Sequence, residues 1–550
     1  MRVIALAAVL FLLAVSVGWG GGVGVSDSAT FTRGVRGNVW SISCAAPGEC
    51  AAGGSYRVGS YRLGLYHEAF VVGERNGVWG KPIEVPGTAK LNSGGNARVR
   101  SISCAAAGEC AAGGYYLDRR SRYQAFVVSE TNGRWGTAIE VPGMETLNRG
   151  RGDLGLLPGG WSISCAAPGE CAAGGYYLDR DSHHQAFVVS ETNGSWGTAI
   201  GVPGTATLNE GGYADVTSNS CAAAGECAAG GYYVDGSGNY QVFVVSETHG
   251  SWGTAIEVPD TATLNAGGDA DLISISCGAA GECAAGGFYE DGNNDTQAFV
   301  VSETNGSWGN AIEVPGTATL NTGGSAWMMS ISCAAVGECA AVGFYSAAGS
   351  GDQAFVVSET NGSWGNAIEV PGTATLNTGG YAEASSISCA AAGECAAVGF
   401  YDDGNDLQAF VVSETNGSWG TAIEVPGVAT LNAGGVAEAN SISCAAAGEC
   451  TAGGYYYESF DNRRAFLVDE ANGSWRNAIQ LRFPAACVVP NVVGKAISAA
   501  RKRLNAARCG VGKITYVYSN LQKGRVVAER PKPGKILRAG AGVALTVSKG

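Results

Sequence analysis

The sequence predicts an all-β fold: an eight-bladed β-propeller with four antiparallel strands in each blade, followed by a small α+β domain. Glycine supplies 86 of 550 residues against only 4 methionines, and β-branched and aromatic residues occur in short runs, which favours short strands and tight turns. Eight cysteine pairs share one spacing and recur every 55 to 61 residues, so one unit is written eight times. The last 64 residues do not follow this repeat.

Each repeat divides into four expected strands, which residues 386–425 illustrate. Residues 386–389 alternate as a first strand and residues 395–401 return as the second. Residues 408–414 form the third, and Asn416-Gly417 is a hairpin turn to a fourth over 419–425, because both turn residues tolerate positive φ. A stacked β-solenoid is the alternative, but its coils usually carry parallel strands, so the hairpin turns favour the propeller.

The N-terminus predicts export. Met1 and Arg2 precede 23 uncharged residues, which indicates a signal peptide or an uncleaved N-terminal anchor over residues 1–25. We expect the propeller over residues 26–483 and the C-terminal domain over 484–550. The protein would be extracellular and would meet a membrane only through the N-terminal segment.

In an exported chain the 18 cysteines should form nine disulfides, eight of them stapling the first hairpin of a repeat. A structural metal site needs four ligands, whereas each repeat offers two cysteines and the four histidines follow no repeat position. We therefore expect no metal and no cofactor. The predicted pairs are Cys44–Cys50, Cys104–Cys110, Cys165–Cys171, Cys221–Cys227, Cys277–Cys283, Cys333–Cys339, Cys389–Cys395, Cys444–Cys450 and Cys487–Cys509.

Charge divides the chain into two parts. Residues 487–550 contain 13 lysines and arginines and one acid, a net charge of +12. The remaining 21 basic and 47 acidic residues give residues 1–486 a net charge of −26. An acidic propeller would repel a polyanion, so no nucleic-acid partner is expected. The basic tail suits an anionic wall polymer.

The repeats give little support for catalysis. A sialidase-type centre would need several arginines at the ring centre, and no arginine recurs at a strand position. His67, His183, His184 and His249 have no partner suggested by sequence. A glutamate precedes each second cysteine; we expect these to be turn residues bonded to nearby amides, with a cation-binding ring as the alternative. They are Glu49, Glu109, Glu170, Glu226, Glu282, Glu338, Glu394 and Glu449.

Variation among the repeats is concentrated at one end of the expected blades. The first and third turns of a blade share one end and are nearly identical in all repeats. The second turn and the link to the next blade share the other end, where residues 178–183, 290–295 and 402–406 differ. Recognition usually lies on such loops, so we expect a glycan or protein ligand there. These Asp- and Asn-rich loops are expected to be ordinary turns, with calcium sites as the alternative.

Two segments resemble known families. The turn over residues 413–419 weakly resembles the Asp-box of sialidase-like β-propellers, which implies fold alone. Val489-Pro490-Asn491-Val492-Val493-Gly494-Lys495, an amphipathic stretch over 496–507, and Pro531-Lys532-Pro533-Gly534 before a last strand over 543–548 resemble a PASTA domain. That resemblance implies one helix against a small sheet and binding to peptidoglycan fragments.

These observations predict an exported, non-catalytic, cell-wall-associated binding or display protein. The propeller would recognise a glycan or a protein, and the basic PASTA-like domain would contact peptidoglycan or an anionic wall polymer. The residues expected to contact that polymer are Arg501, Lys502, Arg503, Lys523 and Arg525. The alternative is a secreted glycan-active hydrolase with a carboxylate pair among the acidic loops.

Overall fold

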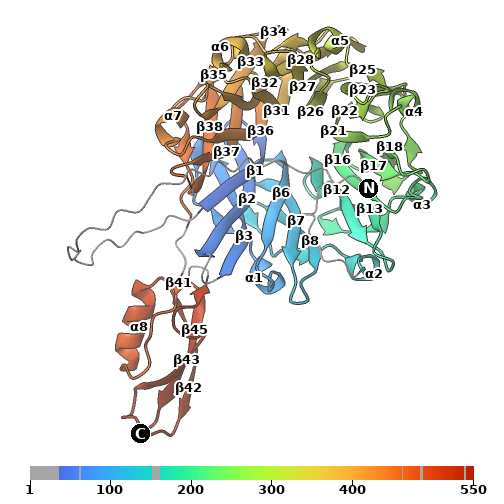
Figure 1. The fold of residues 1–550 in the computed structure, drawn as a ribbon. Helices are drawn as coiled ribbons and strands as arrows, with labels where there is room; N and C mark the ends of the chain where they lie inside the picture. Colours follow the sequence, from blue (N-terminus) through green and yellow to red (C-terminus); the bar gives the residue numbers. More distant parts are fainter. Residues whose placement is uncertain (1–35, 61–63, 151–160, 461, 484–486, 538–539) are drawn as a thin grey trace, which may run out of the picture. The chain divides into compact units, whose positions relative to one another are not determined.

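Short alternating runs of small and β-branched residues build eight antiparallel sheets, one from each repeat. The computed structural model describes residues 36–550 except 61–63, 151–160, 461, 484–486 and 538–539, so the expected signal or anchor segment lies outside the described residues. The sheets follow one another around a common axis (Figure 1). Each innermost strand contacts that of the next blade, and that of blade eight contacts that of blade one. The predicted eight-bladed propeller is confirmed.

The strands of each blade run in the predicted order from the axis outward. The innermost strands are β1 (Arg36–Ala46), β6 (Ala97–Ala106), β11 (Ser162–Ala167), β16 (Ala214–Ala223), β21 (Ala270–Ala279), β26 (Ala326–Ala335), β31 (Ala382–Ala391) and β36 (Ala437–Ala446). The second strands are β2 (Glu49–Ser60), β7 (Glu109–Leu117), β12 (Glu170–Leu178), β17 (Glu226–Val234), β22 (Glu282–Glu290), β27 (Glu338–Ala347), β32 (Glu394–Asp402) and β37 (Glu449–Tyr457). The third are β3 (Gly64–Arg75), β8 (Tyr123–Thr131), β13 (His184–Thr192), β18 (Tyr240–Thr248), β23 (Thr296–Thr304), β28 (Gly351–Thr360), β33 (Leu407–Thr415) and β38 (Arg463–Ala471).

The fourth strand of each blade is divided into two short segments, where the sequence predicted one continuous strand. In blade seven Ala422 lies between the two segments, and its N–H donates to the carbonyl of Pro371 in the preceding connection at 2.7 Å. A bond to the neighbouring blade thus replaces a bond within the sheet. The segments are β4 (Val78–Trp79) and β5 (Ile83–Glu84), β9 (Arg134–Trp135) and β10 (Ile139–Glu140), β14 (Ser195–Trp196) and β15 (Ile200–Gly201), β19 (Ser251–Trp252) and β20 (Ile256–Glu257), β24 (Ser307–Trp308) and β25 (Ile312–Glu313), β29 (Ser363–Trp364) and β30 (Ile368–Glu369), β34 (Ser418–Trp419) and β35 (Ile423–Glu424), and β39 (Ser474–Trp475) and β40 (Ile479–Gln480).

A one-turn helix, which the sequence did not predict, opens each of seven connections between blades. A residue with positive φ precedes each helix, and six of these seven residues are glycines, with Asp260 as the exception. The helices are α1 (Thr88–Leu91), α2 (Met144–Leu147), α3 (Thr205–Leu208), α4 (Thr261–Leu264), α5 (Thr317–Leu320), α6 (Thr373–Leu376) and α7 (Val428–Leu431).

Serine hydroxyls join the innermost strands of neighbouring blades. One edge of an innermost strand has no partner in its own sheet, so its backbone N–H groups need other acceptors. Ser388 accepts from the N–H of Cys444 in the next blade at 3.0 Å. Ser443 accepts in the same way from Cys44 at 2.9 Å, across the closure from blade eight to blade one. All eight joints repeat this bond and a second one two residues earlier, so the Ser-x-Ser-Cys motif ties the ring together.

The apolar core lies between the faces of successive blades. Val356 of blade six and Phe410 of blade seven, both fully buried, belong to one such cluster. At the closure, Phe483 follows blade eight and fills the joint. Its ring stacks on Tyr56 with centroids 5.2 Å apart and meets Phe70 edge-on at 4.7 Å.

Nine disulfides join the 18 cysteines in the predicted pairs. Eight of them link directly opposite residues of the first and second strands, with Cα atoms 3.9 to 4.0 Å apart. Each therefore closes the inner hairpin of a blade.

The C-terminal segment folds as one helix against two small sheets. The ninth disulfide, Cys487–Cys509, joins the segment's first strand to the end of the helix, and Ala500 and Leu504 of the helix are fully buried. Strand β45 lies between β42, which is parallel to it, and β43, which is antiparallel. The elements are β41 (Cys487–Val488), α8 (Ile497–Ala506), β42 (Gly510–Val517), β43 (Val526–Arg530), β44 (Ile536–Leu537) and β45 (Gly542–Ser548).

Candidate ligand-binding site

At the disulfide end of the propeller lie the first and third turns of each blade, and the repeated side chains there stabilise these turns. Glu282 accepts a hydrogen bond from the backbone N–H of Asn305 at 3.0 Å, which ties the first turn to the third. The equivalent glutamates of the other seven blades make the same bond. The prediction that these glutamates are turn residues is confirmed. Among the described residues, no group of three or more His, Cys, Asp or Glu side chains is placed to hold a metal ion.

The opposite, variable end carries the second turns and the connections between blades. Asp291 accepts from the backbone N–H groups of Asn293 and Asp295, at 2.7 and 3.1 Å. Those bonds hold the pKa of Asp291 below its usual value despite some desolvation. Asp118, Asp179, Asp235 and Asp403 make the same type of turn. These carboxylates serve as acceptors for their own loops, as expected for ordinary turns.

A cavity of about 340 Å³, here named the basic pocket, opens at the variable end between blades eight, one and two. Its charged residues come from four different strands: the start of β1, the end of β2, the start of β6 and the start of β38. The four arginines occupy four different positions of the repeat, because the pocket forms where non-equivalent strand positions of neighbouring blades meet. The lining residues are Arg36, Gly37, Asn38, Trp40, Ser55, Arg57, His67, Arg98, Tyr457 and Arg463.

His67 lies among the guanidinium groups of this pocket as a neutral side chain. Its Nε2 accepts from Nε of Arg57 at 3.4 Å, so the ring proton is on Nδ1. Burial, together with the nearby charges of Arg98, Arg57 and Arg463, lowers the pKa of His67 from 6.5 to about 3. The imidazole is therefore a neutral donor at physiological pH.

Three of the four arginines of the pocket form no ion pair with a carboxylate in the part of the chain that the structure describes. Among the described residues, Arg57, Arg98 and Arg463 form no ion pair, and the buried Nε of Arg98 makes no hydrogen bond. Arg463 is held in place by Tyr457, whose hydroxyl accepts from it at 3.1 Å, and by the ring of Tyr455 at 3.9 Å. No acidic residue lines the pocket.

Acidic groups occupy the equivalent strand positions in other blades. Asp271 of blade five corresponds to Arg98 of blade two, and burial with the nearby charge of Asp269 raises its pKa to about 8. Burial likewise raises the pKa of Glu383 in blade seven to about 7. In blade three, the ring of His184 stacks between those of Tyr176 and Tyr213, with centroids 4.5 and 4.0 Å away. The variable end therefore differs in charge from one side of the ring to the other.

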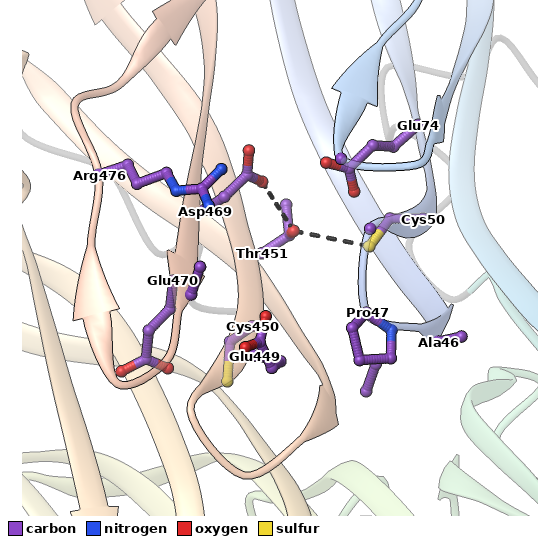
Figure 2. Close-up of a pocket in the computed structure, with 14 residues that line it drawn as sticks. Ala46, Pro47, Cys50, Glu74, Glu449, Cys450, Thr451, Asp469, Glu470 and Arg476 are labelled. Carbon is purple, nitrogen blue, oxygen red and sulfur yellow. Dashed lines mark hydrogen bonds between the residues drawn. The ribbon is translucent and has the colours of Figure 1, made fainter.

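A second cavity, of about 210 Å³, lies at the disulfide end where blade eight meets blade one. Figure 2 shows Glu74 on one side of it, with Asp469 and Arg476 on the other. Burial, then the charges of Asp469 and Glu49, raise the pKa of Glu74 from 4.5 to about 7. Asp469 accepts from the hydroxyl of Thr451 at 2.8 Å. This carboxylate pair lies at the opposite end of the propeller from the basic pocket.

The sequence did not predict the basic pocket. No partner was expected for His67, and no arginine recurs at one strand position, whereas the structure gathers four arginines from four positions. Aligning the repeats carries the signal: Arg36 and Arg98 interrupt strand positions that are not basic in the other described blades. His183 lies 3.7 Å from Asp179 and His249 lies 3.8 Å from Glu226, both on the surface.

The predicted polymer-binding residues are all on the surface of the C-terminal segment. Arg501, Lys502 and Arg503 are consecutive and exposed on α8, whereas Lys523 and Arg525 lie before β43. Arg525 also donates to the carbonyl of Gly494 at 2.8 Å. Residues 488–549 match the PASTA domain family. The C-terminal domain is a PASTA domain. The exposed cations of the PASTA domain can reach a polymer without unfolding any part of it.

Solved structures similar to the chain include both binding proteins and an enzyme. The BP39L lectin of Burkholderia pseudomallei is 14% identical, with 69% of this chain and 98% of the lectin covered and a TM-score of 0.38. The six-bladed fucose-binding lectin of Aleuria aurantia is 12% identical, with coverage of 70% and 95% and a TM-score of 0.28. A polysaccharide lyase, the PL25 ulvan lyase, is 11% identical, with coverage of 67% and 91% and a TM-score of 0.40.

No curated protein matches the chain. In the part of the chain that the structure describes, no helix is long and apolar enough to cross a membrane.

Proposed function

We propose that this protein is an extracellular, non-catalytic binding protein of the cell wall. The PASTA domain at residues 488–549 is the observation that carries the proposal, since such domains bind peptidoglycan. The nine disulfides agree with an oxidising compartment. In this proposal the PASTA domain contacts peptidoglycan or an anionic wall polymer, and the variable end of the propeller binds a saccharide.

The division of labour rests on charge. The PASTA domain region carries a net charge of +12 and the rest of the chain −26, so an anionic polymer is attracted by one part and repelled by most of the other. The three consecutive cations of α8 are all exposed and point in different directions around the helix, so together they offer charge to a polymer over a wide part of its surface. Such contacts between exposed charges weaken as salt rises, because charges are screened within about 10 Å at 0.1 M salt.

Retention on purified cell walls tests this proposal. We expect the combined substitution Arg501→Gln, Lys502→Gln and Arg503→Gln to lower retention of the full chain about tenfold at 0.1 M salt. The matched control removes the same charge from the propeller, where the exposed residues Arg119, Arg120 and Arg134 are changed to Gln. Equal losses for both variants, or no loss for the α8 variant, would contradict the proposal.

The alternative, a glycan-active hydrolase, is less well supported. General acid–base hydrolysis needs two carboxyl groups facing one substrate. The basic pocket has none, and Glu74 and Asp469 lie at the other end of the propeller. We expect no release of reducing ends from wall glycans by the full chain, and measurable turnover would replace the proposal with this alternative.

A further inference from the structure

The basic pocket combines three features that together define a ligand: its polar side chains are donors, three of its four arginines form no ion pair among the described residues, and its volume exceeds that of a simple ion. Four guanidinium groups line it, and the proton of His67 is on Nδ1 because Nε2 accepts from Arg57. Each of these groups donates hydrogen bonds. A ligand that satisfies them must be rich in acceptors.

The uncharged polar residues of the pocket are also set to donate. The side-chain oxygen of Asn38 accepts from Asn440 at 3.3 Å, whereas its Nδ2 has no partner, although Asn38 is only 3% exposed. A buried amide left without a partner costs about 1–3 kcal/mol, so a ligand oxygen at this point is favourable. Ser55 accepts from the indole N–H of Trp40 at 3.4 Å, which leaves its own proton free to donate.

The cations raise the energy of the empty pocket. Like charges placed together without counter-charges repel one another, and burial strengthens that repulsion. Arg57 and Arg98 form no ion pair among the described residues, and Arg463 forms none either, although the carboxylate of Glu438 lies near enough to interact with its charge. A ligand with a negative group would remove this cost, and carboxylate matches the planar fork of a guanidinium.

The size of the pocket favours a ligand larger than a simple anion. A volume of about 340 Å³ is about ten times the roughly 30 Å³ that one water molecule occupies in the liquid. It falls at the lower end of the range of roughly 300–1,000 Å³ typical of pockets for small molecules. The flat side chains of Trp40 and Tyr457 in its wall suit the faces of a ring.

We propose that the basic pocket binds an acidic sugar, with its carboxylate among Arg36, Arg57, Arg98 and Arg463 and its hydroxyl oxygens on the remaining donors. This inference rests on the proposed saccharide binding by the propeller and specifies the class of saccharide. It concerns the propeller alone and is independent of polymer binding by the PASTA domain.

A pair of matched probes tests the inference on the full chain. Methyl β-D-glucuronide and methyl β-D-glucoside share the ring and differ at C6, where one has a carboxylate and the other a hydroxymethyl group. We expect titration calorimetry to show saturable binding of the glucuronide, at least tenfold tighter than binding of the glucoside. Inorganic phosphate at the same concentration should compete weakly, because it lacks the ring.

Variants locate the binding site. Arg57→Gln and Arg98→Gln should each weaken glucuronide binding tenfold or more, whereas Arg180→Gln, an exposed arginine in a loop at the same end, should leave it unchanged. Thermal unfolding identifies a variant that fails to fold, and a change in the total tryptophan fluorescence, to which Trp40 contributes, reports binding independently of heat. Conservative Arg57→Lys should recover part of the affinity, since it keeps the charge but loses the fork.

The outcomes separate this inference from the proposed function. Equal binding of both sugars would overturn the acidic-sugar inference but retain saccharide binding by the propeller. If inorganic phosphate bound the pocket as tightly as the glucuronide and displaced it, the pocket would be a site for simple anions. That result would overturn the inference. Binding of neither sugar also overturns it, whereas wall retention through α8 would still test the proposed function separately.

Discussion

The joint between blades eight and one replaces a hydrogen bond that most other joints share. In six joints a serine hydroxyl donates to a buried glutamate of the next blade, as Ser413 does to Glu470 at 2.8 Å. At the closure, Asp469 stands in the serine position and faces Glu74, so the donor is replaced by a second carboxylate (Figure 2). We predict that Asp469→Ser stabilises the propeller.

The magnitude follows from the pKa of Glu74. A carboxyl with a pKa of about 7 in the folded protein and 4.5 in the unfolded chain keeps its proton longer when folded, so stability falls as pH rises from 4.5 through 7. The full difference corresponds to about 3 kcal/mol. Burial is the largest cause of the raised pKa of Glu74, and the Asp469→Ser substitution leaves that burial unchanged. Water in the adjacent cavity also screens the charge of Asp469, so only part of the full difference can be recovered. We therefore expect Asp469→Ser to recover about 1 kcal/mol at pH 8.

Chemical denaturation at several pH values, with the disulfides intact, measures this gain. The gain should fade by pH 4, where Glu74 is protonated in both folded and unfolded chains. The matched control is Ser413→Asp, which recreates the carboxylate pair beside Glu470 and should lose about 1 kcal/mol at pH 8. The reasoning fails if Asp469→Ser gives no gain at pH 8, or the same gain at pH 4 and pH 8.

Three further substitutions test the scaffold. Ser43→Ala removes the acceptor for the N–H of Cys104 and should cost about 1–2 kcal/mol in denaturant unfolding, whereas Ser43→Thr should keep most of the bond. Asn305→Ala, at φ 51°, should cost about 1 kcal/mol, while Asn305→Gly should be close to neutral; equal losses would show that backbone strain is not the cause. Replacing Cys487 and Cys509 by serine should destabilise the PASTA domain by about 3 kcal/mol in the chain-entropy treatment, seen as earlier hydrogen exchange in α8.

The repeated features of this fold were predictable from sequence because a strand or turn that is ambiguous in one repeat is supported by the same pattern in the other seven. Eight copies of the same turn and cysteine spacing specify the inner hairpin, and φ values of 51° at Asn416 and 72° at Gly417 match the turn expected there. The interruption of the fourth strand was not predictable in this way. It depends on a bond from Ala422 to Pro371 of another blade, which local sequence does not reveal.

The basic pocket escaped sequence analysis for a related reason. An arginine that recurs in every repeat would mark a site only if equivalent positions of the blades met at the axis, as the serines of the Ser-x-Ser-Cys motif do. Arg57 and His67 lie opposite one another on β2 and β3, whereas Arg98 and Arg463 reach the same cavity from neighbouring blades. Their proximity depends on the ring closing between repeats that are 400 residues apart, as the contact between β1 and β36 shows.

The closure is also where the constraints of the repeat are weakest. In seven connections a proline carbonyl accepts a hydrogen bond from an alanine N–H of the next blade, but blade one has Pro82 at the alanine position and cannot make that bond. Phe483 fills the joint there instead of a one-turn helix. Both cavities described above lie against this joint. The closure keeps the bonds of the Ser-x-Ser-Cys motif but lacks the alanine–proline and serine–glutamate bonds of most other joints, so its residues can differ from the repeat without opening the ring, and the residues of the basic pocket do differ from it.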